Sequence, residues 1–151
     1  MSEVKNAEYS SYELEILIEV SREKVWKALV EDTNGWWLPS FHMVAEDSVV
    51  TLDAEAGGLL VERRKGGGSL LWYTVHMVEP GRSICLVGQS FPAWGGPCTT
   101  MLTLSLEDSD TGCIFRVSDA LLGRVSDGLI KNMREGWTEL FTKGLKKHCE
   151  A

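Results

Sequence analysis

Short links rich in glycine, proline and aspartate separate six runs of apolar and β-branched residues in the middle of the chain. The runs lie near 48–53, 58–64, 69–78, 82–89, 99–107 and 113–119. Runs of this composition are typical of β-strands, and glycine, proline and aspartate are the residues that turns require. A parallel crossover needs about a dozen residues or more, which these links do not contain. The pattern therefore predicts a meander of antiparallel hairpins.

The two ends of the chain add one strand and two helices to this meander. Residues 12–20 alternate between apolar and acidic side chains, which predicts a strand with one buried face. Ser21 then stands where a helix N-cap is expected, and apolar residues recur at helical spacing until Asn34-Gly35. Across 126–148 they recur every three or four positions, which predicts one long amphipathic helix.

Length and charge limit the class of protein. The 151 residues suffice for one domain spanning 1–151, with an ordered core at about 12–148. The formal charge of -7 argues against nucleic acid as a partner, because such binding depends on Lys and Arg neutralising phosphates. No stretch approaches the roughly 20 apolar residues of a membrane span, and 1–11 do not resemble a secretory signal. We therefore expect a cytoplasmic protein without a membrane span.

The four cysteines do not predict a metal site. They form no Cys-x-x-Cys pair and have no histidine at zinc-finger spacing: Cys85, Cys98, Cys113 and Cys149. Free thiols are the expected state, although the sequence leaves a Cys85–Cys113 bridge open. No metal and no cofactor are expected.

Several local motifs resemble one known superfamily. They are Val25-Trp26-Lys27-Ala28-Leu29, Gly57-Gly58, Glu79-Pro80 and Gly136-Trp137 followed by Leu140 and Leu145. With the order of elements over about 12–148, they resemble the START-like, or SRPBCC, superfamily and its branch named for activators of the ATPase of the ninety-kilodalton heat-shock protein. The resemblance implies an α+β helix-grip fold, as in birch-pollen-allergen-like proteins, with a curved antiparallel β-sheet around a long C-terminal α-helix.

The resemblance also implies an apolar cavity between the sheet and the helix. By position, the residues expected to bind a ligand there are Trp36, Trp37, Trp72, His76, Trp94, Leu102, Leu104, Phe115, Met133, Trp137 and Phe141. No catalytic residue is assigned. Members of the branch often carry a histidine near the end of the last strand, where this sequence has Phe115-Arg116-Val117-Ser118-Asp119-Ala120, so chemistry that depends on this histidine is not expected.

Several of these residues have a structural alternative. Trp36 and Trp37 would serve equally as core packing. Alternation places His76 on the same strand face as Trp72 and Thr74, where it would supply a polar group or a general base in the cavity; the alternative is a structural or an exposed histidine. Asp119 either faces the cavity or caps the turn before the last helix.

Two groups of charged residues and one aromatic segment also have an expected place in the fold. The pair Glu135 and Glu139 is expected on a solvated helix face, and residues 62–65, Glu-Arg-Arg-Lys, at a solvated hairpin tip. Residues 91–98 are long and aromatic for a hairpin loop and would form a lid. No nucleophile signature surrounds any of the three histidines.

Three functions are compatible with these patterns. The favoured one is binding of an apolar small molecule, such as a lipid, an aromatic compound or a polyketide-like compound. An enzyme related to cyclases, aromatases or hydratases would need a convergent polar pair in the same cavity, and is less favoured. A co-chaperone-like interaction module ranks below both, so contact with a chaperone is not expected. An acidic face with a few exposed aromatic residues would permit a weak homodimer.

Overall fold

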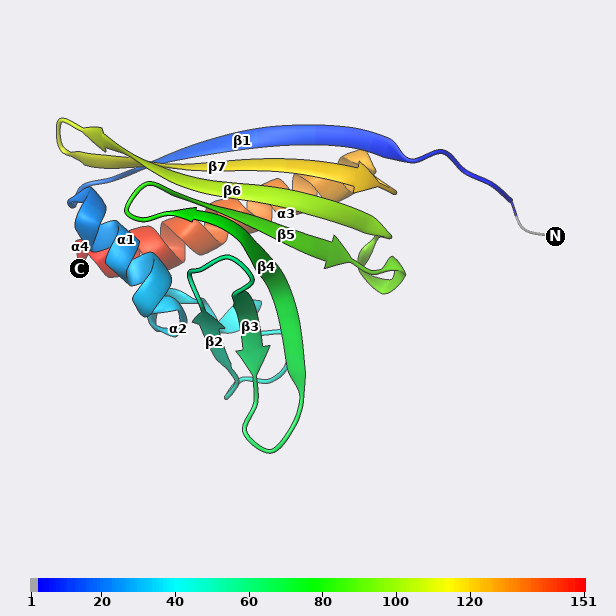
Figure 1. Cartoon of the computed structure of the whole chain (residues 1–151), viewed down its shortest axis with the longest axis horizontal. Coiled ribbons are helices and arrows are strands. Elements are labelled where there is room, and N and C mark those ends of the chain that lie inside the picture. The colour runs from blue at the N-terminus through cyan, green and yellow to red at the C-terminus, as the bar shows by residue number, and fades with distance from the viewer. Residues whose placement is uncertain (1–2) are drawn as a thin grey trace.

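A curved, seven-stranded antiparallel sheet forms the larger part of the structure, a computed structural model that describes residues 3–151 (Figure 1). Its strands are β1 (Glu8–Ile18), β2 (Val49–Leu52), β3 (Leu59–Arg63), β4 (Ser69–Glu79), β5 (Ser83–Ser90), β6 (Cys98–Ser109) and β7 (Gly112–Gly123). Their order in the sheet is β1-β7-β6-β5-β4-β3-β2. Consecutive strands from β2 to β7 are neighbours, as the short links predict, and β1 closes the other edge.

The helices lie in three groups. One group joins β1 to β2: α1 (Arg22–Glu31), α2 (Thr33–Trp36) and the 3₁₀-helix η1 (Pro39–Phe41). The 3₁₀-helix η2 (Pro92–Trp94) joins β5 to β6. The C-terminal helix consists of α3 (Asp127–Glu139), the π-helical segment η3 (Leu140–Lys146) and α4 (Lys147–Glu150).

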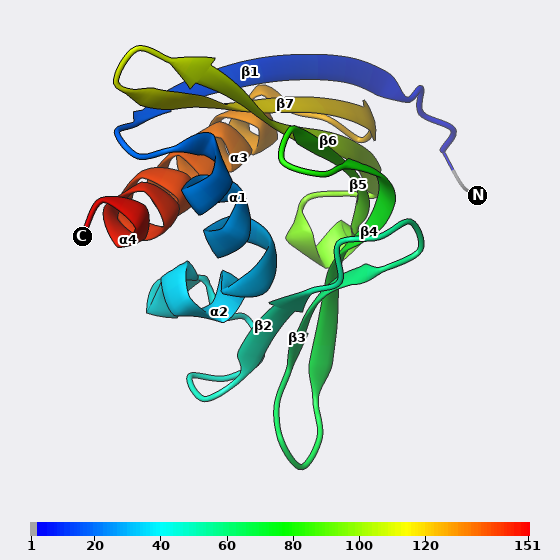
Figure 2. The ribbon, with the colours of Figure 1, turned by 60° about the vertical axis from the view of Figure 1, so that its left-hand side comes forward.

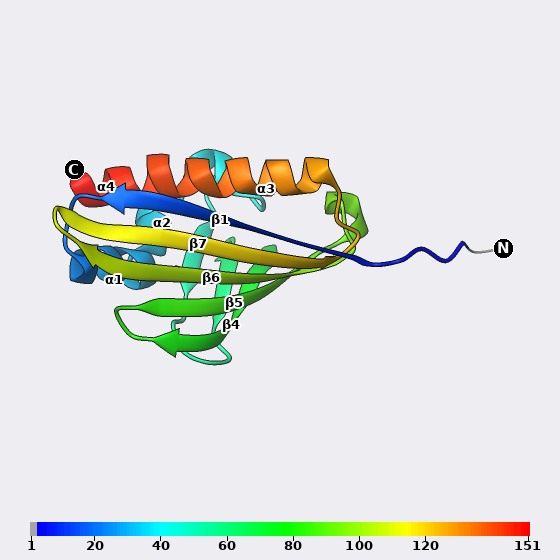
Figure 3. The same ribbon diagram turned by 90° about the horizontal axis from the view of Figure 1, so that it is seen from above.

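The C-terminal helix runs along β1 and β7, as the view from above shows (Figure 3). The turned view shows the sheet bending away from these strands, so that β2, β3 and β4 lie at an angle to them (Figure 2). This arrangement confirms the predicted curved antiparallel sheet around a long C-terminal helix.

Serine caps fix where the two main helices begin. The Ser21 hydroxyl accepts a hydrogen bond from the backbone N–H of Lys24 at 3.2 Å. Ser126 accepts one from the backbone N–H of Leu129 at 3.1 Å. Each cap satisfies one of the N–H groups that a helix leaves without an internal partner, which contributes about 1 kcal/mol.

Aromatic packing joins the inner face of the sheet to the C-terminal helix. The ring of Phe141 lies 4.8 Å from Phe115 of β7, 5.4 Å from Trp137 and 5.9 Å from Trp36, measured between centroids. All four side chains are buried. Each buried aromatic ring of this kind stabilises the fold by about 1.5–3 kcal/mol, so this cluster anchors the helix.

Several element boundaries differ from the sequence-based prediction, among them the following three. β1 begins at Glu8 rather than at Tyr12, because its first residues pair with the end of β7, where Glu8 lies opposite Gly123. Asn34-Gly35 does not end the helical pattern but lies inside the short helix α2. The C-terminal helix continues past His148 to Glu150.

Gly144 marks the closest approach of the C-terminal helix to another segment. A Cβ atom at this position would collide with the backbone oxygen of Trp36 in α2. The absence of a side chain at Gly144 therefore allows the C-terminal helix to pack closely against α2. Gly136 has ordinary space, since a Cβ there would lie 3.9 Å from the ring of Phe41.

All four cysteines carry free thiols, so the structure does not contain the Cys85–Cys113 bridge that the sequence left open. Within residues 3–151, no helix combines the length and the apolar character needed to cross a bilayer.

Candidate functional site

A pocket of about 300 Å³ opens between the C-terminal helix, the middle strands and the segment that precedes β2. Its walls come from α3, β4, β5, β6, η1 and η2 and their flanks: Trp37, Phe41, Met43, Leu70, Leu71, Trp72, Tyr73, Gln89, Ser90, Trp94, Thr100, Met133, Gly136 and Trp137. Most of these side chains are apolar or aromatic. The pocket therefore suits a ligand whose surface is largely apolar.

Two aromatic pairs line this pocket. The ring of Trp37 contacts Trp72 edge-on at a centroid distance of 5.2 Å. In the second pair, the ring centroid of Tyr73 lies 6.0 Å from that of Trp137 of α3. Trp94 of η2 is half exposed beside the exposed ring of Phe91, and these two rings meet edge-on at 5.7 Å.

A bulge in β4 brings two consecutive residues to the pocket. Opposite β3, Leu60 pairs with Tyr73 and Val61 pairs with Leu71, which leaves Trp72 without a partner. Regular alternation would place Trp72 and Tyr73 on opposite faces of the sheet. The extra residue of the bulge explains why both line the same pocket.

His76 lies outside the pocket. A second irregularity of β4 pairs Val75 with Leu86 and Met77 with Cys85, so that His76 is the unpaired residue. Its side chain is exposed. The expectation that His76 shares a buried face with Trp72 is therefore wrong, because these bulges interrupt the alternation on which it depended.

The structure divides the other predicted ligand-binding residues into two groups. Trp37, Trp72, Trp94, Met133 and Trp137 come together around the pocket. The remaining five lie in the packed core instead and do not line it: Trp36, Leu102, Leu104, Phe115 and Phe141. Trp36 is held there by its indole N–H, which donates to the backbone oxygen of Ala28 at 2.9 Å.

Sequence reasoning did not place Phe41, Met43 or Thr100 at the pocket. The first two belong to the irregular segment after Pro39, which carries no periodic signal. Thr100 could have been found, because it alternates with Cys98 and Leu102 on the inward face of its strand. A polar residue in such a position is the exception that marks a buried hydrogen bond.

A polar cluster lies behind one wall of the pocket. The Asp119 carboxylate accepts hydrogen bonds from the Tyr12 hydroxyl at 2.7 Å and from the Thr100 hydroxyl at 2.5 Å. The Tyr73 hydroxyl lies 3.4 Å from the Thr100 oxygen. Tyr73 and Thr100 line the pocket, whereas Asp119 does not. Asp119 therefore faces the interior of the fold and does not cap the turn before the last helix.

Burial dominates the electrostatics of this cluster. It raises the pKa of Asp119, although hydrogen bonds from Thr100 and Tyr12 act in the opposite direction. Burial and the nearby Asp119 charge likewise raise the pKa values of Tyr12 and Tyr73, so both phenols keep their protons at physiological pH. The indole N–H of Trp137 is buried without a hydrogen-bond partner among residues 3–151, but lies near enough to favour ionised Asp119.

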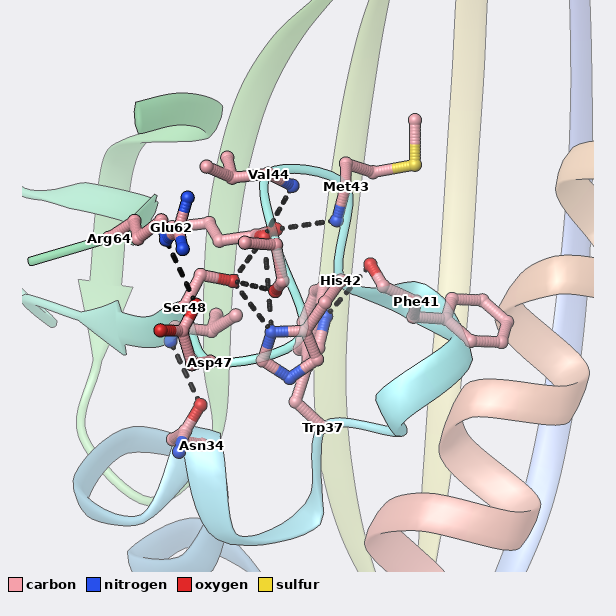
Figure 4. A network of polar contacts seen from close by, with 12 residues as sticks. Asn34, Trp37, Phe41, His42, Met43, Val44, Asp47, Ser48, Glu62 and Arg64 are labelled. Atoms are coloured by element: carbon pink, nitrogen blue, oxygen red, sulfur yellow. Dashed lines mark hydrogen bonds and ion pairs between the residues drawn. The ribbon is translucent and has the colours of Figure 1, made fainter. Parts of the chain in front are cut away.

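A second buried carboxylate, Glu62, fixes another wall of the pocket (Figure 4). Its two oxygens accept hydrogen bonds from the backbone N–H groups of Met43 (3.1 Å) and Val44 (2.7 Å), the Ser48 hydroxyl (2.5 Å) and the Trp72 indole (3.1 Å). Its side chain is fully buried. Glu62 is therefore not part of a solvated hairpin tip as predicted, because the segment before β2 folds over the end of β3 and covers it.

Burial alone would raise the pKa of Glu62, but hydrogen bonds from Ser48, Val44, Met43 and Trp72 outweigh it and lower this pKa. The carboxylate consequently stays ionised. Since Met43 and Trp72 both line the pocket, Glu62 positions two of its walls at once.

Ser48, His42 and Glu62 do not form a nucleophilic triad. His42 Nδ1 lies 2.9 Å from the Ser48 oxygen and 3.8 Å from the Glu62 carboxylate. Ser48 donates directly to Glu62, is buried, and does not line the pocket. A nucleophilic serine would instead need an accessible hydroxyl that gives its proton to the histidine. Within residues 3–151, no group of three or more His, Cys, Asp or Glu side chains is placed to hold a metal ion.

A curved antiparallel sheet closed around a C-terminal helix, with an apolar pocket between them, defines a helix-grip protein of the START-like superfamily. The chain belongs to the family described as Activator of Hsp90 ATPase homolog 1-like protein, whose model matches residues 19–150. None of the curated proteins matches it in sequence.

Solved structures support the fold. The chain resembles Mll3558 from Rhizobium loti with a TM-score of 0.72 and 17% identity, over 95% of this chain and 99% of that one. A protein from Rhizobium leguminosarum gives a TM-score of 0.68 and 18% identity, over 98% and 99%. Ara h 8.0201 gives a TM-score of 0.69 and 14% identity, over 94% and 98%.

Proposed function

We propose that the chain binds a small, largely apolar molecule in the pocket between β4, β6 and the C-terminal helix. The observation that carries this proposal is the pocket itself, a volume of about 300 Å³ whose walls are mostly aromatic and aliphatic. Hydrophobic surface that stays open to water in a folded protein is costly, so a pocket of this kind favours a ligand that covers it.

The expected affinity follows from the apolar surface that a ligand would bury. A molecule that buries roughly 200 Å² in the pocket gains about 5 kcal/mol from its removal from water. The costs of association reduce this gain, whereas contacts with the pocket walls add to it. Dissociation constants in the micromolar range are the expected result.

Binding is preferred over catalysis because of the groups that face the pocket. The polar side chains on its walls are uncharged, namely Thr100, Tyr73, Gln89 and Ser90. Asp119 lies behind Thr100, and His76 points to solvent, so neither is placed to exchange a proton with a bound ligand. Contact with a chaperone ATPase, which the family's name suggests, ranks below both functions.

The test is a direct search for a bound molecule. Native mass spectrometry of the freshly purified chain, followed by extraction with organic solvent, should reveal an apolar compound that co-purifies. Titration with Nile red, a neutral apolar dye, should give a saturable rise in fluorescence with a micromolar dissociation constant.

A variant that fills the pocket sharpens this test. Gly136 lines the pocket and has space for a side chain, so Gly136→Leu should fill part of the volume and weaken Nile red binding about tenfold or more. Gly128→Leu is the matched control, because Gly128 is exposed near the start of the same helix and lies outside the pocket. An empty wild-type protein that also fails to bind the dye would overturn the proposal.

A further inference from the structure

The inner wall of the pocket carries a row of three aligned residues from neighbouring strands. Thr74 pairs with Val87, which sets Tyr73 of β4 beside Gly88 of β5, and Gly88 pairs with Thr100 of β6. A Cβ atom on Gly88 would lie 2.7 Å from the Tyr73 ring. The absence of a side chain at Gly88 therefore lets the phenol lie across β5 and bring its hydroxyl to Thr100.

The direction of the hydrogen bonds along this row follows from counting protons. A hydroxyl has one proton, and the proton of Thr100 is donated to Asp119. Thr100 must therefore accept in its contact with Tyr73, so the Tyr73 hydroxyl donates to it across 3.4 Å. The hydroxyls of Tyr73 and Thr100 thus both donate their protons within the protein. Only the lone pairs of their oxygens are free to accept a hydrogen bond from a ligand.

The charges around the pocket disfavour an anionic ligand. None of the described residues that line the pocket is Lys, Arg or His, so a ligand anion would find no counter-charge. Asp119, directly behind Thr100, would repel an anion when ionised. A bound carboxylate would lose its hydration and would find only uncharged donors such as the Gln89 amide in return, which is costly in an apolar site.

We propose that the pocket selects apolar molecules that end in an uncharged hydrogen-bond donor, a hydroxyl or phenol, and rejects those that end in a carboxylate. This inference rests on the proposed function and specifies its ligand class. The hydroxyl proton of the ligand meets the free lone pairs of Thr100 and Tyr73, while its apolar body contacts the aromatic walls.

Three naphthalene compounds with the same ring test this selection at pH 7 by displacement of Nile red. 2-Naphthol is uncharged and can donate, 2-methoxynaphthalene can only accept, and 2-naphthoate is an anion. We expect 2-naphthol to bind about fivefold more tightly than the ether, which is the net effect of about one hydrogen bond. 2-Naphthoate should bind about tenfold more weakly than the ether, or not at all.

Variants of the wall connect this preference to the named hydroxyls. Thr100→Val removes the acceptor and releases the Tyr73 proton toward the pocket, so the naphthol-to-ether ratio should fall close to one. Tyr73→Phe keeps the bond between Thr100 and Asp119 and should also lower the ratio, which retains the test if Thr100→Val does not fold. Thr103→Val is the control, since Thr103 lies on the opposite face of β6 and should leave the ratio unchanged.

The outcomes separate the two proposals. If Nile red and the ether bind but 2-naphthol gains no advantage, or 2-naphthoate binds as tightly, the head-group inference is overturned and the proposed function stands. If the ratio survives in both wall variants, the assigned hydroxyls are wrong. If no probe binds, Nile red included, the proposed function fails and this inference fails with it.

Discussion

Glu62 and Asp119 are buried carboxylates whose surroundings shift their pKa values in opposite directions. Glu62 receives two backbone N–H groups, a hydroxyl and an indole, which together replace water around the charge. Asp119 receives hydrogen bonds from two hydroxyls, and these, together with the Ala120 backbone N–H and the nearby Trp137 indole, do not outweigh the effect of burial. Glu62 therefore joins the segment before β2 to β4 through a buried charge. Asp119 instead binds the hydroxyl of Thr100, which lines the pocket.

Replacing Glu62 by glutamine should destabilise the fold. The side chain keeps its size, but its NH₂ group then meets the backbone N–H groups and the Trp72 indole, for which no second acceptor lies within hydrogen-bond distance, whereas the Ser48 hydroxyl can still donate to the backbone oxygen of Ala45. Leaving such donors unsatisfied in the interior should lower the free energy of unfolding by about 3 kcal/mol. Urea unfolding measures this change, with the exposed Glu46→Gln in the same segment as the control. A loss of under 0.5 kcal/mol, the range of ordinary surface substitutions, would show that the network is not structural.

Three residues show which parts of the site could be predicted from the sequence and which could not. Asp119 stands at an inward position of an alternating strand, so its polarity there was visible in the sequence. Glu62 gave no such signal, because it is covered by a segment without periodicity that lies distant along the chain. His76 was misplaced because bulges depend on how two strands register, and a single strand does not reveal this.

At the scale of elements, the long C-terminal helix offers two glycines with opposite roles. Gly136 has ordinary space around it, whereas Gly144 touches the backbone of α2. The strands and this helix were predictable from their periods and turn residues. The pocket was only half predictable, because its wall between α2 and β2 is an irregular segment.

Alanine substitutions should separate these two glycines. Gly136→Ala removes the entropic cost of glycine in a helix and should raise the free energy of unfolding by about 0.5–1 kcal/mol. Gly144→Ala should lower it by about 2 kcal/mol, because the methyl group would push the helix away from the oxygen of Trp36. Thermal unfolding of both variants measures the difference. Equal effects at the two positions would contradict the assigned contact.

At the scale of the whole molecule, the buried carboxylates determine how stability depends on pH. The folded-state pKa of Glu62 is lowered, so its contribution is present above the ordinary glutamate value of about 4.3 and is lost as the pH falls through the lower folded value. The contribution of Asp119 to stability depends on pH in the opposite direction. Its contribution is present below the ordinary aspartate value of about 3.9 and is lost as the pH rises through the raised folded value.

The difference in stability between the wild type and Glu62→Gln should therefore depend on pH in one direction. It should be constant above about pH 5 and shrink as the pH falls below about 4, since glutamine does not titrate. Urea unfolding from pH 3 to pH 7 measures it for both proteins. A difference that widens on acidification would mean that the pKa of Glu62 is raised rather than lowered.

The pairing of β1 with β7 has a consequence for synthesis. Tyr12 bonds to Asp119, 107 positions later in the chain, so β1 is synthesised before the other strands of the sheet, whereas β7, which pairs with it, is synthesised after them. Until β7 is synthesised, β1 is an unpaired strand with an apolar face that includes Ile16 and Ile18, and such a strand can pair with another nascent chain. The acidic residues Glu13 and Glu15 alternate with that face and repel a second copy. We therefore expect the negative charge of this strand to limit pairing between copies before β7 is in place.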